Sequence, residues 1–322
     1  MSVALLGVVL AYVDLGEMRK ALEDGDWRWF LAGAVFIAGA VVIGALRWRV
    51  LLDGGQIRAT RLRASKVFAA SVVLNHVLPT SVGGDALRTW LVGRESGRLV
   101  SAATATIVDK LASLVCLVTL AWVALALDPD GVPGSVVGVF VWITVGLALV
   151  LVAAALAAMG VRPILHRLPG RVVVMIREIW TTFRVWVRSA KLMSSFVSLA
   201  VTYQVLVVLA YMLIGKTVGL ELTFSLMAVS LSVVLLAMMI PVSIGGLGVR
   251  EGGFVLLLGQ ADIGAAQATV FSLLSVGAMV VASGAVFVVT AAVERLCSPE
   301  RESRVTRPEP ATTSDASHRI AP

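Results

Sequence analysis

Residues 75–88 read NHVLPTSVGGDALR, and residues 237–250 read AMMIPVSIGGLGVR. The two stretches align without a gap at an offset of 162 residues, so that Pro79 falls on Pro241 and Arg88 on Arg250. The same offset aligns three further pairs: Ser81 with Ser243, Gly83 with Gly245 and Gly84 with Gly246. Proline stops a helix because it lacks an amide hydrogen and clashes with the preceding turn, and a glycine pair permits a sharp turn. Each stretch therefore predicts the end of one helix and the start of another.

The composition surrounding these stretches is that of a membrane protein. Of 322 residues, 58% are hydrophobic and 15% are charged, and the mean hydropathy is +0.94. So few charges cannot cover the surface of a soluble protein of this size. The net charge is +7, but the basic residues lie in short loops between apolar blocks, where they set membrane orientation. No nucleic-acid partner is expected.

Six apolar blocks predict transmembrane helices, since crossing the hydrocarbon layer takes about 20 residues. The first block is short for a span. The blocks are Ser2–Asp14, Trp27–Leu52, Ser101–Leu127, Ser135–Met159, Ser195–Gly215 and Gly264–Val293. The two Pro-Gly stretches lie in Ala64–Gly97 and Leu222–Gly259, between these blocks.

Loop charges predict the topology. Arginines follow the second block, from Arg47 to Arg63, and return at Arg88, Arg94 and Arg98, whereas residues 128–134 and 216–221 carry little positive charge. The positive-inside rule then places both termini in the cytoplasm, provided that each Pro-Gly region enters and leaves the membrane on one side. An alternative with eight full crossings also puts both termini inside, but it places Arg88, Arg94 and Arg98 outside. The prediction is an all-α, polytopic helical membrane protein with six spans and two re-entrant helical hairpins.

The repeat suggests how the chain is organised. Three crossings per half invert the second half relative to the first, and inverted repeats with broken helices are a recurring plan of transporters. The expected membrane domain is 1–297, with repeat one at about 1–134 and repeat two at about 135–297. A simpler interpretation is that P-x-S-x-G-G is only a frequent helix break; the arginine shared at the same offset argues against it.

Two further segments differ from the spans. In residues 171–191, apolar residues recur at helical spacing and basic residues fall on another face of the same helix. This pattern is typical of a basic amphipathic helix on the anionic cytoplasmic leaflet. An ordinary helix packed on the bundle would show it too. Residues 298–322 are polar and without periodicity, as in a disordered cytoplasmic tail.

The hairpins have the chemistry of an anion site. A helix that starts at membrane depth leaves its first amides unpaired, with partial positive charge there, and the glycines allow close backbone approach. Arg88 and Arg250 lie within the first turns of the expected helices, and a guanidinium can grip a phosphate with two hydrogen bonds. The predicted binding residues at the glycine turns are Gly83, Gly84, Gly245 and Gly246.

Further charged residues at membrane depth are also candidate site residues. A charge at that depth is costly unless it is paired, so it is expected to have a function. Asp85 can pair with Arg88 three residues on, while Asp109 and Lys110 should lie beside the first hairpin. Glu251 follows Arg250, and Asn75 either contacts the substrate or caps freed backbone. The alternative is that these charges form structural salt bridges only.

Catalytic and metal chemistry is not indicated. The cysteines and histidines are scattered, and no nucleophile, catalytic carboxylate pair or nucleotide loop can be assembled. Asp128 and Asp130 have the spacing of a metal-binding pair, although a turn explains them better. No cofactor and no metal are expected.

The sequence resembles the lysylphosphatidylglycerol synthase transmembrane family, also called flippase-like. The residues that carry the resemblance are Arg47-Trp48-Arg49, Leu51-Leu52, Asn75, Leu78-Pro79, Gly83-Gly84-Asp85, Arg88 and the block from Pro241 to Glu251. Asp109-Lys110 departs from the acid-arginine pair frequent in the family. The resemblance implies translocation of an anionic lipid, either an aminoacyl-phospholipid or a polyprenyl-phosphate-linked glycan, across the cell membrane. It also implies that aminoacylation, where it occurs, belongs to a separate domain.

Two other functions stay open at this stage. One is a scaffold or subunit for a separate lipid-modifying synthase. The other is a membrane enzyme acting on polyprenyl-phosphate, which would need the acidic pair Asp128 and Asp130.

Overall fold

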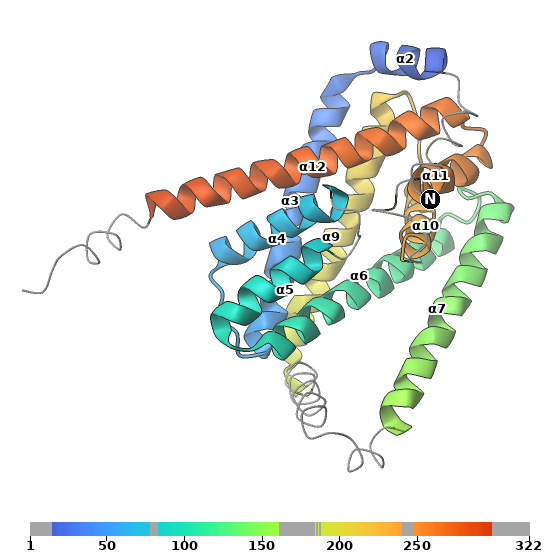
Figure 1. Ribbon diagram of the computed structural model, residues 1–322. Coiled ribbons are helices and arrows are strands. Elements are labelled where there is room, and N and C mark those ends of the chain that lie inside the picture. The colour runs from blue at the N-terminus through green and yellow to red at the C-terminus, as the bar shows by residue number, and fades with distance from the viewer. Residues whose placement is uncertain are drawn as a thin grey trace, which may run out of the picture.

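The computed structural model describes residues 15–77, 83–160, 188–239 and 248–297, together with 184, 186 and 246. This part of the chain is helical throughout (Figure 1). Its helices are α2 (Leu15–Glu23), α3 (Trp27–Gly54), α4 (Arg61–Val77), α5 (Gly83–Ser96), α6 (Leu99–Leu127), α7 (Gly134–Gly160), α9 (Ala190–Thr217), α10 (Phe224–Ala237), α11 (Val249–Gly259) and α12 (Ala265–Leu296).

Four of the helices are long and apolar enough to cross a membrane: α3, α6, α9 and α12. They coincide with four of the six expected spans. The span expected at Ser135–Met159 corresponds to α7, whose stretch Gly134–Val150 is apolar but shorter. The first expected span lies outside the described residues, as do most of the expected amphipathic helix and the tail from residue 298.

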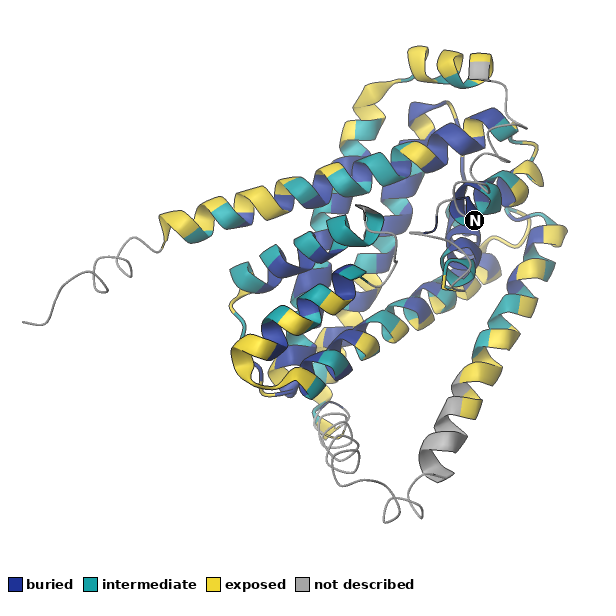
Figure 2. Ribbon diagram, in the orientation of Figure 1, coloured by how far each residue is buried: buried dark blue, intermediate teal, exposed yellow. Residues whose placement is uncertain are grey.

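The distribution of polar residues suits a lipid environment. Large apolar side chains face outward, such as Trp142, which is 77% exposed on α7, and Val288 and Val289 on α12 (Figure 2). Charged side chains are found inside instead, among them Arg88 and Asp109. Water would penalise this arrangement, whereas hydrocarbon accepts apolar surfaces and requires that charges be paired.

The Pro-Gly stretches separate pairs of short helices, as predicted. Helix α4 packs against α5, and α10 packs against α11. Helix α4 ends at Val77 and α10 at Ala237, a few residues before the two prolines. The residues between, 78–82 and 240–245, are not among those described. Pro79, Pro241, Ser81, Ser243 and Gly245 fall there.

Helix bounds follow the offset found in the sequence. Moved by 162 residues, α3 falls on 189–216, and α9 spans Ala190–Thr217. The same shift carries α4 onto α10, α5 onto α11 and α6 onto α12, with starts that agree within four residues and ends within seven. A duplication predicts this correspondence of elements.

The packing is reciprocal between these corresponding helices. Helix α3 packs along α9 through the middle of the molecule, α4 packs on α12, and α10 packs on α6 (Figure 1). Exchanging each helix for its counterpart turns the α4–α12 contact into the α10–α6 contact. This is the pattern that a two-fold relation between halves produces.

Each of the helix pairs α4–α5 and α10–α11, called the first and second hairpin here, has one position that favours glycine. A Cβ on Gly84 would lie 1.9 Å from the backbone oxygen of Ser71 on α4, so only glycine lets α5 start against that helix. Gly246 has φ +79°, a conformation that glycine adopts without strain.

We therefore expect Gly84→Ala to lower the free energy of unfolding by about 1–3 kcal/mol, the usual penalty of overpacking. Unfolding of the purified protein in detergent micelles would measure it. Gly284→Ala on α12 is the matched control, because a Cβ there meets nothing within 4 Å. Equal stability of the two variants would contradict the close α4–α5 contact.

Candidate functional site

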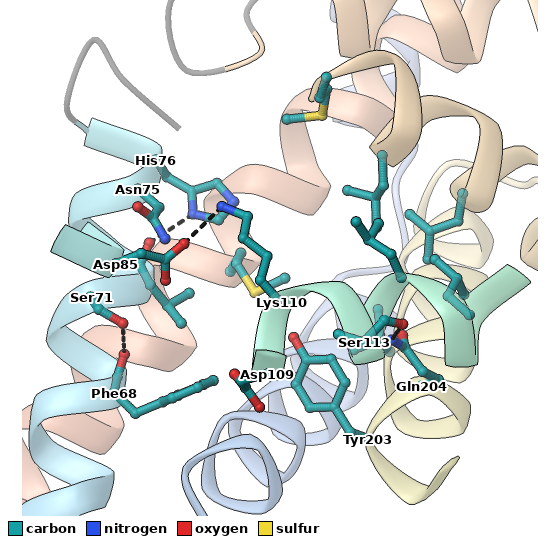
Figure 3. Close-up of a pocket in the computed structure, with 18 of the residues that line it drawn as sticks. Phe68, Ser71, Asn75, His76, Asp85, Asp109, Lys110, Ser113, Tyr203 and Gln204 are labelled. Carbon is teal, nitrogen blue, oxygen red and sulfur yellow. Dashed lines mark hydrogen bonds and ion pairs between the residues drawn. The ribbon is translucent and has the colours of Figure 1, made fainter. Parts of the chain in front are cut away.

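A cavity of about 250 Å³ lies where α3, α4, α5, α6, α9 and α10 meet, with Arg250 of α11 on its wall; it is called the polar cavity here because charged side chains stand among its apolar lining residues. Its charged lining consists of Arg47, Arg88, Lys110, Arg250, Asp85 and Asp109. Figure 3 shows Asp109, Lys110 and Tyr203 on one side of this cavity and Asn75, His76 and Asp85 on the other. Four cations and two carboxylates line the cavity, and Glu251 pairs with Arg250 behind the wall. Among these residues one positive charge is left over, which favours an anion.

Asp109 joins three helices. One of its carboxylate oxygens accepts from Arg47 Nε of α3 at 2.8 Å, and the other accepts from Arg88 Nη2 of α5 at 3.3 Å. Arg47 Nη1 also donates to Ser113 Oγ at 3.3 Å. Arg47, Arg88 and Asp109 are each at most 3% exposed. Both buried guanidinium groups therefore share the carboxylate of Asp109.

Asp85 links the first hairpin to α6. It lies 3.1 Å from Arg88 Nη2, and it accepts from Lys110 Nζ at 2.7 Å. Figure 3 shows this contact between Lys110 and Asp85. The local pairing of Asp85 with Arg88, and the position of Asp109 and Lys110 beside the first hairpin, are as the sequence predicted.

Arg88 is the cation with the least complete set of partners. Its Nε and Nη1 are buried without a hydrogen-bond partner among the described residues. The guanidinium carbon lies 5.1 Å from the ring centroid of Trp48 and 5.0 Å from that of Phe68, so aromatic faces hold the charge in place. A buried donor with no acceptor costs about 1–3 kcal/mol.

Arg250 is held differently. It pairs with Glu251, and its Nε is 3.3 Å from Ser272 Oγ on α12. Glu251 also accepts from the backbone N–H of Gly248 at 2.6 Å, which caps the start of α11. Both residues are buried. Each hairpin thus contributes one arginine to the same cavity.

Two polar residues of α4 complete the first hairpin. Asn75 Oδ1 accepts from the backbone N–H of Gly84 at 2.8 Å; of its two expected roles, the structure therefore shows the backbone cap. His76 Nδ1 lies 2.8 Å from the carbonyl oxygen of Val72, and its ring lines the cavity.

The structure brings most of the predicted site residues together. The cavity is lined by Asn75, Asp85, Arg88, Asp109, Lys110 and Arg250. Gly83 and Gly84 begin α5, while Gly246 and Glu251 flank or begin α11. Gly245 lies outside the described residues.

Arg47 is the main correction. It was expected among the loop arginines that set orientation, but it lies inside α3, 2% exposed and paired with Asp109. Its position near the end of an apolar block hid this role. Tyr203 and Gln204 of α9 also line the cavity. Gln204 Nε2 donates to Ser113 Oγ at 2.8 Å. The centroid of the Tyr203 ring lies 4.7 Å from the guanidinium carbon of Arg47.

Metal-binding groups of three or more His, Cys, Asp or Glu are absent from the described residues. Asp128, one half of the acidic pair in the loop after α6, accepts from Ser225 Oγ at 2.6 Å. That carboxylate helps to hold the loop against the start of α10.

Comparison with known families gives one match. The profile described as the lysylphosphatidylglycerol synthase TM region matches residues 1–286. The comparisons with curated proteins and with solved structures gave no match.

Proposed function

The chain belongs to the lysylphosphatidylglycerol synthase transmembrane family, and from this premise we propose that it translocates an anionic lipid between the leaflets of the cell membrane. The observation that carries the proposal is the Arg88 guanidinium, which lines the cavity with two buried nitrogens that lack hydrogen-bond partners in the described structure. A lipid phosphate supplies the missing acceptors.

The chemistry of the group selects phosphate. A guanidinium presents donors in a planar fork that matches two oxygens of one phosphate. Arg88 uses only Nη2 for its carboxylate partners, so the N–H groups of Nε and Nη1 are left as separate donors for phosphate oxygens. Such hydrogen bonds to charged groups contribute about 1.5–3 kcal/mol each.

The presence of one arginine from each half in the same cavity supports a transport function. Arg88 and Arg250 line one cavity from α5 and α11, and these helices correspond at the repeat offset. The proposal takes the two halves as inverted repeats with six crossings, re-entrant hairpins and cytoplasmic termini. Rocking of the halves about the cavity then exposes it to each side in turn. The lipid head group passes from one arginine to the other.

Arg88→Ala is a clean test of the site because it leaves no acid unpaired. Asp85 keeps Lys110, and Asp109 keeps Arg47. Purified protein would be placed in liposomes with head-group-labelled phosphatidylglycerol, and leaflet exchange would be followed by chemical quenching. Arg94→Ala is the matched control, since Arg94 is an exposed residue on the same helix.

We expect wild type and Arg94→Ala to exchange the lipid, and Arg88→Ala to be slower by about tenfold or more, the loss of one charge-assisted bond. Labelled phosphatidylcholine, which has no net charge, should exchange more slowly in wild type. Exchange by Arg88→Ala at the wild-type rate would show that the arginine has a structural role only. No exchange above protein-free liposomes for any anionic or polyprenyl lipid would favour the scaffold or the enzyme.

A further inference from the structure

An apolar groove lies next to the polar cavity, between α6, α7 and the end of α10. It has a volume of about 500 Å³. Its lining is apolar throughout: Leu111, Leu114, Val115, Ile143, Gly146, Leu147, Val150, Leu236, Ala237 and Met239. Val115, Val150 and Met239 are each more than 40% exposed, so the groove opens on the outer surface of the helices, where lipid lies.

The groove and the cavity are neighbours that share a wall. Leu114 of α6 lines both. At the end of α10, Leu235 and Met238 face the cavity while their neighbours Leu236 and Met239 face the groove. The wall between the two spaces is therefore about one side chain thick.

We propose that this groove holds an acyl chain of the lipid whose head group occupies the polar cavity. The inference rests on the proposed function and adds to it the place of the chain and the side by which the lipid enters. The lipid approaches between α6 and α7, with its phosphate toward Arg88 and Lys110 and its chain along α7.

The spacing of residues on α6 and α7 matches a lipid. Lys110 reaches Asp85 in the cavity, and Leu114 lies about one helical turn further along α6, a rise of about 6 Å. Ile143, Gly146, Leu147 and Val150 follow the i, i+3, i+4, i+7 pattern of one helix face, which gives the groove a length of about 10 Å along α7. Polar and apolar linings thus meet within one turn, as the phosphate and chain of a lipid do.

The groove is expected to set where the lipid lies more than how tightly the protein binds it. Moving a chain from the bilayer into an apolar groove changes little free energy, because lipid tails are as apolar as leucine. Holding the chain beside the cavity instead fixes where the head group enters. Blocking the groove is therefore expected to stop translocation and to leave binding of a chain-free head group intact.

Gly146 allows the groove to be filled without disturbing the backbone. A Cβ at this residue meets nothing within 4 Å, and the same holds for Gly138 two turns earlier on α7, which does not line the groove. Gly146→Trp and Gly138→Trp are thus matched variants, one inside the groove and one outside it.

The experiment compares both variants with wild type in the liposome exchange assay. Binding of glycerophosphoglycerol, the soluble head group of phosphatidylglycerol, is measured beside it by calorimetry. We expect Gly146→Trp to lose most of the exchange and to bind the head group as wild type does, while Gly138→Trp behaves as wild type in both.

The outcomes separate the two claims. Wild-type exchange by Gly146→Trp would overturn the groove as a chain site and leave the proposed function standing. Loss of head-group binding together with exchange would also overturn it, since head group and chain would then not be held separately. Failure of wild type to exchange any lipid would overturn the proposed function and the chain site with it.

A second readout does not depend on transport. Phosphatidylglycerol with a photoreactive group in its acyl chain should label residues 111–115 and 143–150, and Arg88→Ala should reduce that labelling. Labelling at Val288 and Val289, which are exposed on α12 away from the groove, should stay the same. Equal labelling at both places in wild type and Arg88→Ala would overturn the proposal.

Discussion

Replacing Asp109 with asparagine is expected to lower the free energy of unfolding by about 3–5 kcal/mol, the usual loss when one partner of a buried ion pair is removed. Asp109 accepts from Arg47 and Arg88 together. Without its charge, Arg47 keeps only the Ser113 hydroxyl and the ring of Tyr203. Denaturant unfolding in detergent micelles would measure the change.

A second substitution makes this prediction specific. Adding Arg47→Met to Asp109→Asn removes the stranded charge, and apolar replacement of a buried pair is often neutral, so most of the lost stability should return. Asp53→Asn is the control. Its carboxylate pairs with Arg49 at 3.6 Å near the surface, where a pair contributes about 0–1 kcal/mol. A double variant as unstable as Asp109→Asn would contradict the pairing.

Arg250→Lys is expected to lower lipid exchange by about tenfold or more, with little change in stability. Lysine can keep the pair with Glu251 but offers a single point of charge in place of the fork. A single ammonium group cannot donate to Glu251, to Ser272 and to a phosphate at once from the separate positions that a planar guanidinium provides. Thermal unfolding would establish that the variant is folded before exchange is measured. Unchanged exchange would remove Arg250 from the transport path.

The spans and the break points could be predicted because their causes are local. A membrane crossing needs about 20 apolar residues, and α3, α6, α9 and α12 lie where such blocks occur. The pair of Asp85 with Arg88 follows from a spacing of three on one helix. The repeat offset, found in fourteen aligned residues, extends to the bounds of four helices in each half.

Arg47 could not be predicted because its partner is 62 residues away. Near the end of an apolar block, a buried arginine and a loop arginine look the same, and only packing of α3 on α6 distinguishes them. Helix α2 was missed for a similar reason, since its charged residues give no span signal. The role of Asn75 also depends on a contact across a helix break, with Gly84.

The two hairpins match in the bounds of their helices but differ in the side chains around their arginines. At the repeat offset Asp109 corresponds to Phe271 and Lys110 to Ser272. Phe271 is fully buried against Phe254, so the second half has an aromatic contact where the first has an ion pair. Arg250 takes Glu251 as its partner instead. The two arginines therefore hold the same place in the fold with different counter-charges.

The central claim is that Arg88 and Arg250 serve one head group in one cavity. The most direct test is leaflet exchange of phosphatidylglycerol in one liposome series: wild type, Arg88→Ala, Arg250→Lys and the double variant, each checked for folding. Residues that act as one unit are not additive. Each single variant is expected to lose most of the exchange, and the double variant is expected to be no slower than the slower single one. Exchange at the wild-type rate in either single variant, or losses that multiply in the double variant, would contradict the claim.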